Sequence, residues 1–265
     1  MLDISLWMWV GFLLAAYSVI ANDSIQTLGT WIASNKKVNW KIMWAFAGSV
    51  LLFAIWYGWY AYDGSISYGR LNKIPFEGVE WYQALAPAVL LLLTRFGIPV
   101  STSFLVLSAF ASTVVLEKVL MKSMMGYCVA GVAAYVIWIV LTRLLDEGKD
   151  IKESNKIKWK IAQWVTTAFL WWTWLSHDMA NIAVFLPRQL SVDVMIIISI
   201  VFVAGLGWML QHRGGKIQKI VLEKKNTKYV RSATLIDLFY FIILYIFKEV
   251  NDIPMSTTWV FVGLL

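Results

Sequence analysis

The chain has 265 residues, of which 60% are hydrophobic and 15% are charged. Soluble domains average about 45–50% apolar and about 25% charged residues, so this composition excludes a disordered chain and argues against a soluble enzyme. The 23 Lys and Arg residues outnumber the 16 Asp and Glu residues, which in so apolar a chain is typical of cytoplasmic loops rather than of nucleic-acid binding. The single cysteine, Cys128, excludes an internal disulfide and a cysteine-rich metal site.

Apolar stretches recur along the chain, and about 20 mostly apolar helical residues are enough to cross a hydrocarbon core about 30 Å thick. The long charge-free stretches are Ile4–Asn22, Ile42–Tyr62, Phe96–Leu116, Ser123–Thr142 and Val194–His212. Shorter or less uniform stretches are Trp81–Thr94, Ile161–His177 and Ser232–Phe247, the last of which contains Asp237. The sequence therefore predicts an all-α, multi-pass membrane protein. The first stretch is not expected to be a cleaved signal peptide, because Asp3 precedes it and no basic residue does.

Two polar motifs interrupt the apolar stretches, and each occurs twice. The acidic motif is Ala21–Gln26 and again Ser176–Asn181, and the hydroxyl motif is Ile98–Ser103 and again Ile253–Thr258. The offset from Asp23 to Asp178 is 155 residues (178 − 23), and the prolines of the hydroxyl motifs have the same offset (254 − 99). Two independent motifs at one offset indicate an internal duplication.

Loop charges predict that the two repeats have opposite orientations, because short loops rich in Lys and Arg stay cytoplasmic. In the first half the connector 36–41 is basic and the connector 63–80 is mixed. In the second half the order reverses, since 187–193 has one Arg and one Asp while 213–231 carries seven basic residues. Equivalent loops are therefore expected on opposite sides of the membrane.

These patterns predict a first inverted repeat over residues 1–145, a solvated linker over 146–160 and a second inverted repeat over 161–265. By the same offset the partner of Ser123 would fall beyond Leu265. The second repeat is accordingly expected to be incomplete at its C-terminus, and a fragment is favoured over a missing helix supplied by a partner chain.

Inverted repeats interrupted by polar residues at matching positions are typical of secondary transporters. In these proteins broken or re-entrant helices meet near the membrane midplane and bind substrate and ions there. A channel, or a structural membrane module built by duplication, is the alternative.

The acidic motifs predict a cation site. An ionised carboxylate at membrane depth costs about 2.5–3.5 kcal/mol on insertion scales, so it needs a cation, a proton or a partner. The residues expected to bind the coupling cation are Asn22, Asp23, Asp178 and Asn181. His177 is a candidate for proton coupling because the pKa of histidine is close to physiological pH, although a hydrogen-bonded packing role is the alternative.

The hydroxyl motifs predict an anion site. Proline is favoured in the first turn of a helix, where free N–H groups and the helix dipole attract anions. Six hydroxyl groups would accompany them, those of Ser101, Thr102, Ser103, Ser256, Thr257 and Thr258. A tetrahedral oxyanion fits such a donor-rich site, whereas the alternative is that these hydroxyls bond their own or a neighbouring helix.

Both motifs resemble the duplicated signatures of the inorganic phosphate transporter family, Gly-Ala-Asn-Asp-x-x-Asn and Pro-x-Ser-Thr-Thr-His. The matching residues are Ala21-Asn22-Asp23, Gly29-Thr30, Asp178-Met179-Ala180-Asn181, Pro99-Val100-Ser101-Thr102 and Pro254-Met255-Ser256-Thr257-Thr258. The chain departs from the signatures at Ile20, Gln26, Ser103, Phe104, Leu175, His177 and Trp259. The resemblance covers nearly the whole chain and implies a central site for phosphate and a coupling cation, Na⁺ or H⁺.

The sequence therefore predicts a secondary active transporter, a symporter of inorganic phosphate with Na⁺ or H⁺, and not an enzyme. Another oxyanion such as sulfate, or a passive anion channel, is the alternative. No cofactor or metal other than the coupling cation is expected. The expected partners are phosphate and the lipid bilayer, not nucleic acid, and homo-oligomerisation is left open. The expected location is the inner membrane of a bacterium.

Overall fold

The computed structural model describes residues 6–72, 74–95, 102–110, 153–214, 229–251 and 257–264, together with isolated residues at 117, 121, 124, 128, 131–133, 135, 136, 139, 218 and 221. The described elements are helical, as expected. They are α1 (Leu6–Ser18), the π-helical η1 (Val19–Asp23), α2 (Ser24–Ser34), α3 (Trp40–Ala61), α4 (Trp81–Arg95), α5 (Thr102–Ser108), α7 (Glu153–Asp178), α8 (Ala180–Ala183), α9 (Val192–Gln211), α11 (Val230–Leu244), the π-helical η3 (Tyr245–Val250) and α12 (Thr257–Leu264). Ser101, Ser256, most of Ser123–Thr142 and the linker up to residue 152 lie outside the described residues.

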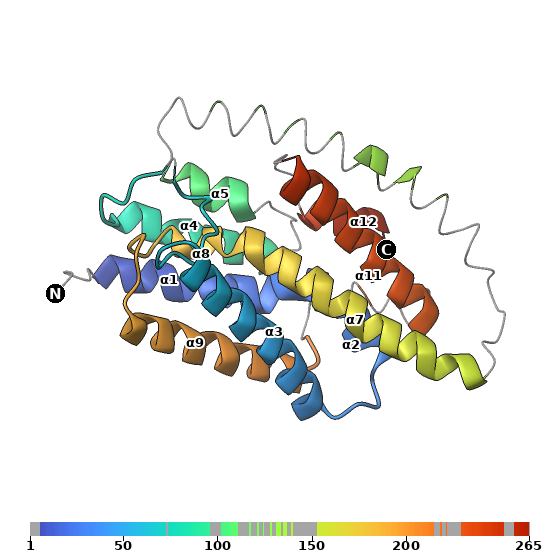
Figure 1. Cartoon of the computed structure of the whole chain (residues 1–265). Coiled ribbons are helices and arrows are strands. Elements are labelled where there is room, and N and C mark those ends of the chain that lie inside the picture. Colours follow the sequence, from blue (N-terminus) through green and yellow to red (C-terminus); the bar gives the residue numbers. More distant parts are fainter. Residues whose placement is uncertain are drawn as a thin grey trace.

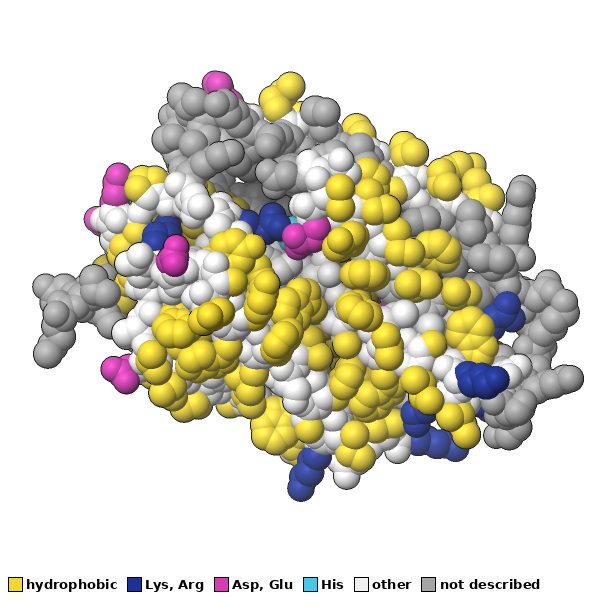
Figure 2. Space-filling model, viewed as in Figure 1, with side chains coloured by type: hydrophobic (Ala, Val, Ile, Leu, Met, Phe, Trp, Pro, Cys, Tyr) yellow, Lys and Arg dark blue, Asp and Glu magenta, His cyan; other side chains and the backbone are white. Residues whose placement is uncertain are grey.

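Four helical runs in the described part are long and apolar enough to cross a membrane, which confirms an integral membrane protein. They are Leu6–Ser34, Trp40–Ala61, Val192–Gln211 and Val230–Val250. The second and third match the predicted stretches closely. Large apolar side chains such as Phe53, Phe169 and Ile200 are more than half exposed on this structure. Figure 2 shows a broad hydrophobic surface on the face that it draws. Such a surface is expected of helices that face lipid.

The first charge-free stretch ends at Asn22, but the helix that contains it does not end there. The helix continues through Asp23 to Ser34, with a widened π-helical turn at the acidic motif. The Ser24 amide reaches back five residues to the Val19 carbonyl, and the Ser24 hydroxyl bonds the Ile20 carbonyl at 2.6 Å. Hydroxyl bonds of this kind compete with the regular helical ladder, so the local sequence supports the wider turn. The second acidic motif does end a helix, because α7 stops at Asp178 and α8 begins at Ala180.

The structure also places residues 153–160 in α7, although the sequence assigned them to the linker. Their charges do not prevent helix formation, because the described side chains of residues 155–158 and 160 are exposed at the end of this long helix. Polar residues that face water are compatible with helix, so the charge pattern marked the edge of the apolar span rather than the start of the helix.

The helices pack in pairs that recur in the two halves. In the first half α4 contacts α1 and α5, and in the second half α11 contacts α7 and α12. Contacts between the two halves follow the same pattern, since α2 packs on α7 and α8 packs on α1. The two halves also meet where α3 packs on α9 (Figure 1). Gly11 allows the approach of α1 to α8, because a Cβ atom at this position would clash with the ring of Phe185. Small residues at helix contacts are typical of membrane proteins.

Hydrogen bonds at both ends of α3 and α9 show that these two helices are antiparallel. At one end the Leu190 amide donates to the Gly64 carbonyl at 2.9 Å, and the Trp59 indole donates to the Leu190 carbonyl at 2.8 Å. At the other end Arg213 Nη2 donates to the Val38 carbonyl at 2.8 Å. The loop after α2 therefore meets the loop after α9, and the loop after α3 meets the loop after α8.

Arg188 joins the connector after α3 to the connector after α8. Its guanidinium donates to the Ile74 carbonyl at 3.0 and 3.1 Å and to the Leu186 carbonyl at 2.9 Å. Burial lowers the pKa of Arg188 to about 10, so the side chain stays charged at neutral pH. A cation beside carbonyl groups at the end of α8 is favourable, because these carbonyls carry partial negative charge.

Candidate functional site

Asp23 lies in the π-helical turn between α1 and α2, where it is 3% exposed. Its Oδ1 accepts hydrogen bonds from Asn22 Nδ2 at 2.8 Å and from Gln26 Nε2 at 3.5 Å. Its Oδ2 accepts a bond from Thr102 Oγ1 at 2.8 Å. A buried carboxylate is stable only when its oxygens are satisfied, and here neutral donors from η1, α2 and α5 satisfy them.

Asp178 lies at the C-terminal end of α7 and is 4% exposed. Its Oδ1 accepts bonds from Asn181 Nδ2 and from Ser103 Oγ, both at 3.3 Å. Its Oδ2 lies 3.5 Å from Nζ of Lys248, which comes from η3. The negative end of a helix disfavours a carboxylate, so the donors from α5 and α8 and the ammonium group offset the cost of placing Asp178 here.

The first turn of α5 joins the two aspartates. Thr102 and Ser103 are consecutive residues, and one bonds Asp23 while the other bonds Asp178. The two acidic motifs and the first hydroxyl motif therefore meet in one buried place, although they are far apart in the sequence. The oxygens present there, from carboxylates, amides and hydroxyls, are suitable ligands for a small hard cation.

The second hydroxyl motif is described only in part. Thr257 is buried at the start of α12, and its carbonyl accepts a bond from Tyr240 Oη at 2.9 Å. α12 packs against α2, which carries Gln26, and against α11, which directly precedes the helical turn that carries Lys248. Ser256 and the side chain of Thr258 lie outside the described residues, as does Ser101. Of the six residues predicted to supply hydroxyl groups, the structure thus describes the side chains of Thr102, Ser103 and Thr257.

His177 belongs to a charged cluster beside the aspartates. Its Nε2 lies 2.8 Å from Glu249 Oε1 and 3.1 Å from Arg70 Nη2. Ser176 Oγ also donates to Glu249 Oε1 at 2.9 Å, and Arg70 Nε donates to the Ser176 carbonyl at 3.2 Å. This cluster ties the connector after α3 to the end of α7 and to η3, so the described contacts of His177 fit a hydrogen-bonded packing role.

Sequence reasoning missed Lys248, Glu249 and Arg70 as neighbours of the site. Lys248 and Glu249 directly follow the apolar stretch that was ended at Phe247, and Arg70 lies in a loop of mixed charge. The missed signal was the position of the pair beside the second hydroxyl motif, next to a helix of membrane length.

A second polar cluster lies where α2, α7 and α11 meet. Asp237 is buried, and its two oxygens accept bonds from the hydroxyls of Thr30 and Thr167, the latter at 2.8 Å. Nearer the end of the molecule, Gln163 accepts a bond from Asn35 at 2.9 Å and donates to Ser34 Oγ at 2.6 Å. These contacts form a ladder of polar side chains along α7.

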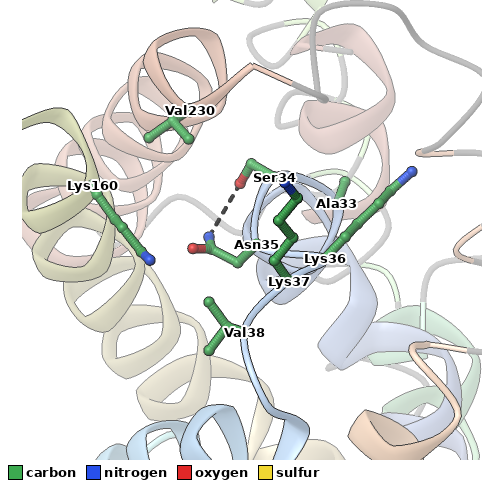
Figure 3. A pocket seen from close by; sticks show the side chains of 8 residues that line it. All are labelled: Ala33, Ser34, Asn35, Lys36, Lys37, Val38, Lys160 and Val230. Carbon is green, nitrogen blue, oxygen red and sulfur yellow. Dashed lines mark hydrogen bonds between the residues drawn. The ribbon is translucent and has the colours of Figure 1, made fainter. Parts of the chain in front are cut away.

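The ladder ends at a surface pocket of about 360 Å³ (Figure 3). The residues that line it are Ala33, Ser34, Asn35, Lys36, Lys37, Val38, Lys160 and Val230. Its three lysines give it a positive character, and it lies at the end of the molecule where the Arg213 loop meets Val38. The pocket does not include Asp23 or Asp178.

Among the described residues no group of three or more His, Cys, Asp or Glu side chains could hold a metal ion. The described groups around Asp23 and Asp178 offer carboxylate, amide and hydroxyl oxygens, which are ligands for hard cations, whereas a transition metal prefers clustered nitrogen or sulfur ligands.

No protein-family model matches the chain, and no curated protein matches it. A solved structure does match, and its title is "The sodium-dependent phosphate transporter". The two chains are 16% identical and superpose with a TM-score of 0.64, over 100% of this chain and 88% of the other. This match shows a shared fold and agrees with the helical membrane architecture predicted from the sequence. The chain has the fold of a sodium-dependent phosphate transporter.

Proposed function

We propose that the protein is a secondary active transporter that moves inorganic phosphate across a membrane together with a cation. The observation that carries this proposal is the bridge made by Thr102 and Ser103 between Asp23 and Asp178. It joins the candidate anion-binding motif to both candidate cation-binding motifs in one buried site.

Electrostatics explains why such a site would couple the two ions. An anion or a cation alone is costly inside the membrane, whereas the pair is much less so because each ion offsets the charge of the other. Asp23 with Asn22, and Asp178 with Asn181, would hold the cation side. The helix starts that carry Ser101, Thr102, Ser103, Ser256, Thr257 and Thr258 would hold phosphate with their hydroxyl and N–H groups.

We infer that the two halves are inverted repeats. The repeat offset relates α1 to α7, α4 to α11 and α5 to α12. The contacts of α4 with α1 and α5 correspond to the contacts of α11 with α7 and α12. The antiparallel α3 and α9 support this proposal, because the offset relates them and their connecting loops lie at opposite ends. In transporters built this way, one repeat rocks against the other around the central site, which gives alternating access.

The test is uptake of radiolabelled phosphate into proteoliposomes under an imposed Na⁺ or H⁺ gradient. The wild type should accumulate phosphate above its electrochemical equilibrium, whereas Asp23→Asn and Asp178→Asn should abolish accumulation. Asp193→Asn is the matched control, because Asp193 is exposed at the start of α9. Accumulation that survives both site substitutions would contradict the proposal.

The same preparation distinguishes the two alternatives. A passive channel never accumulates phosphate above equilibrium, whatever cation gradient is applied. A sulfate transporter would show uptake of labelled sulfate that phosphate inhibits only weakly. We expect instead that phosphate inhibits its own tracer strongly and that sulfate in equal concentration does not. Comparison of the Na⁺ and H⁺ gradients at fixed pH identifies the coupling cation, for which the neighbouring structure favours Na⁺.

A further inference from the structure

The two aspartates that the repeat makes equivalent have different electrostatic partners. Asp178 Oδ2 lies 3.5 Å from the ammonium group of Lys248. Asp23 accepts its hydrogen bonds from Thr102, Asn22 and Gln26, and within the described residues no basic side chain lies at ion-pair distance from it. Among the described residues, the charge of Asp178 is balanced by a basic side chain, and the charge of Asp23 is not.

The sequence shows that this difference breaks the symmetry of the repeat. The offset of 155 residues that relates Asp23 to Asp178 relates Lys248 to position 93 (248 − 155), which is Leu93. Leu93 lies in α4, the helix equivalent to α11 and η3. The first half therefore has an apolar residue where the second half has a cation.

Lys248 is committed to Asp178. Its side chain is 8% exposed, which is rare for a lysine without a compensating charge. Glu249, the acidic residue next in sequence, is already engaged by His177 at 2.8 Å, by Ser176 at 2.9 Å and by Arg70 at 3.8 Å. The described contacts leave Asp178 as the acidic partner of Lys248.

We propose that the ammonium group of Lys248 takes the place of a coupling cation at Asp178, so that Asp23 is the carboxylate that binds the mobile cation. This inference rests on the proposed transport function. An ammonium group carries the same single charge as Na⁺ and donates hydrogen bonds, but it is tethered and cannot be released to the other side. The protein therefore moves one cation fewer with each phosphate than a site with two free aspartates would.

The first test counts cations in the wild-type protein. Equilibrium binding of ²²Na⁺ to purified protein with phosphate present should saturate at one ion that depends on Asp23, and uptake should rise with Na⁺ with a Hill coefficient near one. If H⁺ drives uptake, the number of H⁺ ions moved with each phosphate is obtained from the phosphate gradient that is at equilibrium with a known H⁺ gradient. Binding of a second ion that Asp178→Asn removes would overturn the inference.

The second test removes the tethered charge. Lys248→Met should leave Asp178 in need of a mobile cation, so uptake should require more Na⁺ and the Hill coefficient should rise toward two. Asp178→Asn alone is expected to abolish accumulation because it leaves the buried charge of Lys248 without its partner. The double variant Lys248→Met with Asp178→Asn removes both charges, so uptake should return with a coefficient of about one. Lys158→Met, at an exposed position on α7, is the matched control.

A direct phosphate contact is the competing role for Lys248, and it predicts a different result. Lys248→Met would then raise the KM for phosphate with the cation coefficient unchanged, which would overturn the inference. Failure of the proposed function is distinguishable, because in that case no cation gradient drives phosphate accumulation by the wild type. Accumulation with two mobile cations would refute only the role of Lys248.

Discussion

At the scale of single residues, the site depends on which donor faces each carboxylate oxygen. Thr102 donates to Asp23 and Ser103 donates to Asp178 from the same helical turn, so a small movement of α5 would alter both carboxylates together. A hydrogen bond to a charged group contributes about 1.5–3 kcal/mol, more than a bond between neutral groups. The hydroxyls of these two residues are therefore expected to matter more than their small size suggests.

We expect Thr102→Val to raise the KM for phosphate about ten-fold, which corresponds to a loss of about 1.4 kcal/mol. Valine keeps the shape of threonine but leaves Asp23 Oδ2 without its donor, while Thr102→Ser should restore most of the affinity. The measurement is the concentration dependence of phosphate uptake. Ser108→Ala is the control on the same helix, because the Ser108 hydroxyl donates to the Leu105 carbonyl of its own helix at 3.1 Å. Equal effects of the valine and serine substitutions would show that the hydroxyl is not used.

At the scale of elements, the contact of α2, α7 and α11 depends on buried polar groups as well as on apolar packing. Asp237 binds hydroxyls from the other two helices, and Gln163 links α7 to the end of α2. Polar bonds between helices are valuable in a membrane because lipid offers no alternative partners, although the measured gain is modest. These hydrogen bonds therefore fix how α2, α7 and α11 are aligned along their lengths, and apolar packing adds to the stability of the interface.

We expect Thr167→Val to destabilise the protein by about 1–3 kcal/mol, because it leaves one oxygen of a buried carboxylate without its donor. Thermal unfolding in detergent measures the change as a lowered Tm. Thr166→Val is the matched control, since the hydroxyl of Thr166 bonds the Gln163 carbonyl of its own helix at 3.0 Å. A Tm lowered equally by both substitutions would mean that the bond to Asp237 contributes nothing.

At the scale of the whole molecule, basic side chains gather toward one end of the helices. Figure 2 shows most of the visible Lys and Arg side chains toward the end where α7 begins, and the visible Asp and Glu side chains elsewhere on this face. The basic connectors after α2 and α9 meet through Arg213 and Val38. Short basic loops stay in the cytoplasm, so this end is expected to face the cytoplasm.

Cysteine accessibility tests this orientation in intact cells. In a background with Cys128→Ser, which removes the exposed native thiol, we expect a membrane-impermeant maleimide to label Glu77→Cys but not Lys37→Cys. Both positions are exposed, one in the connector after α3 and the other in the connector after α2. Permeabilised cells provide the control, in which both should react. Labelling of the two sites from the same side would contradict the proposed topology.

Much of the architecture could be predicted from the sequence, for a physical reason. A membrane span needs a minimum length of apolar helix, so Ile42–Tyr62 and Val194–His212 were found almost to the residue. The charge pattern did not show where the helices begin and end. The first helix continues past Asp23 and α7 begins at Glu153, because a helix tolerates polar residues wherever tertiary contacts or water satisfy them. The fold of the matched transporter agrees with the predicted helical membrane class.

The sequence by itself determined that the acidic and hydroxyl motifs are duplicated at one offset among apolar stretches, because offset and hydropathy are properties of the linear chain. Only the tertiary structure decided which groups meet. Lys248 reaches Asp178 and not Asp23, and His177 faces Glu249 and Arg70, because packing of η3 against the end of α7 brings these side chains together. Electrostatic partnership depends on distances of a few ångströms across the fold, and no pattern along the chain specifies those distances.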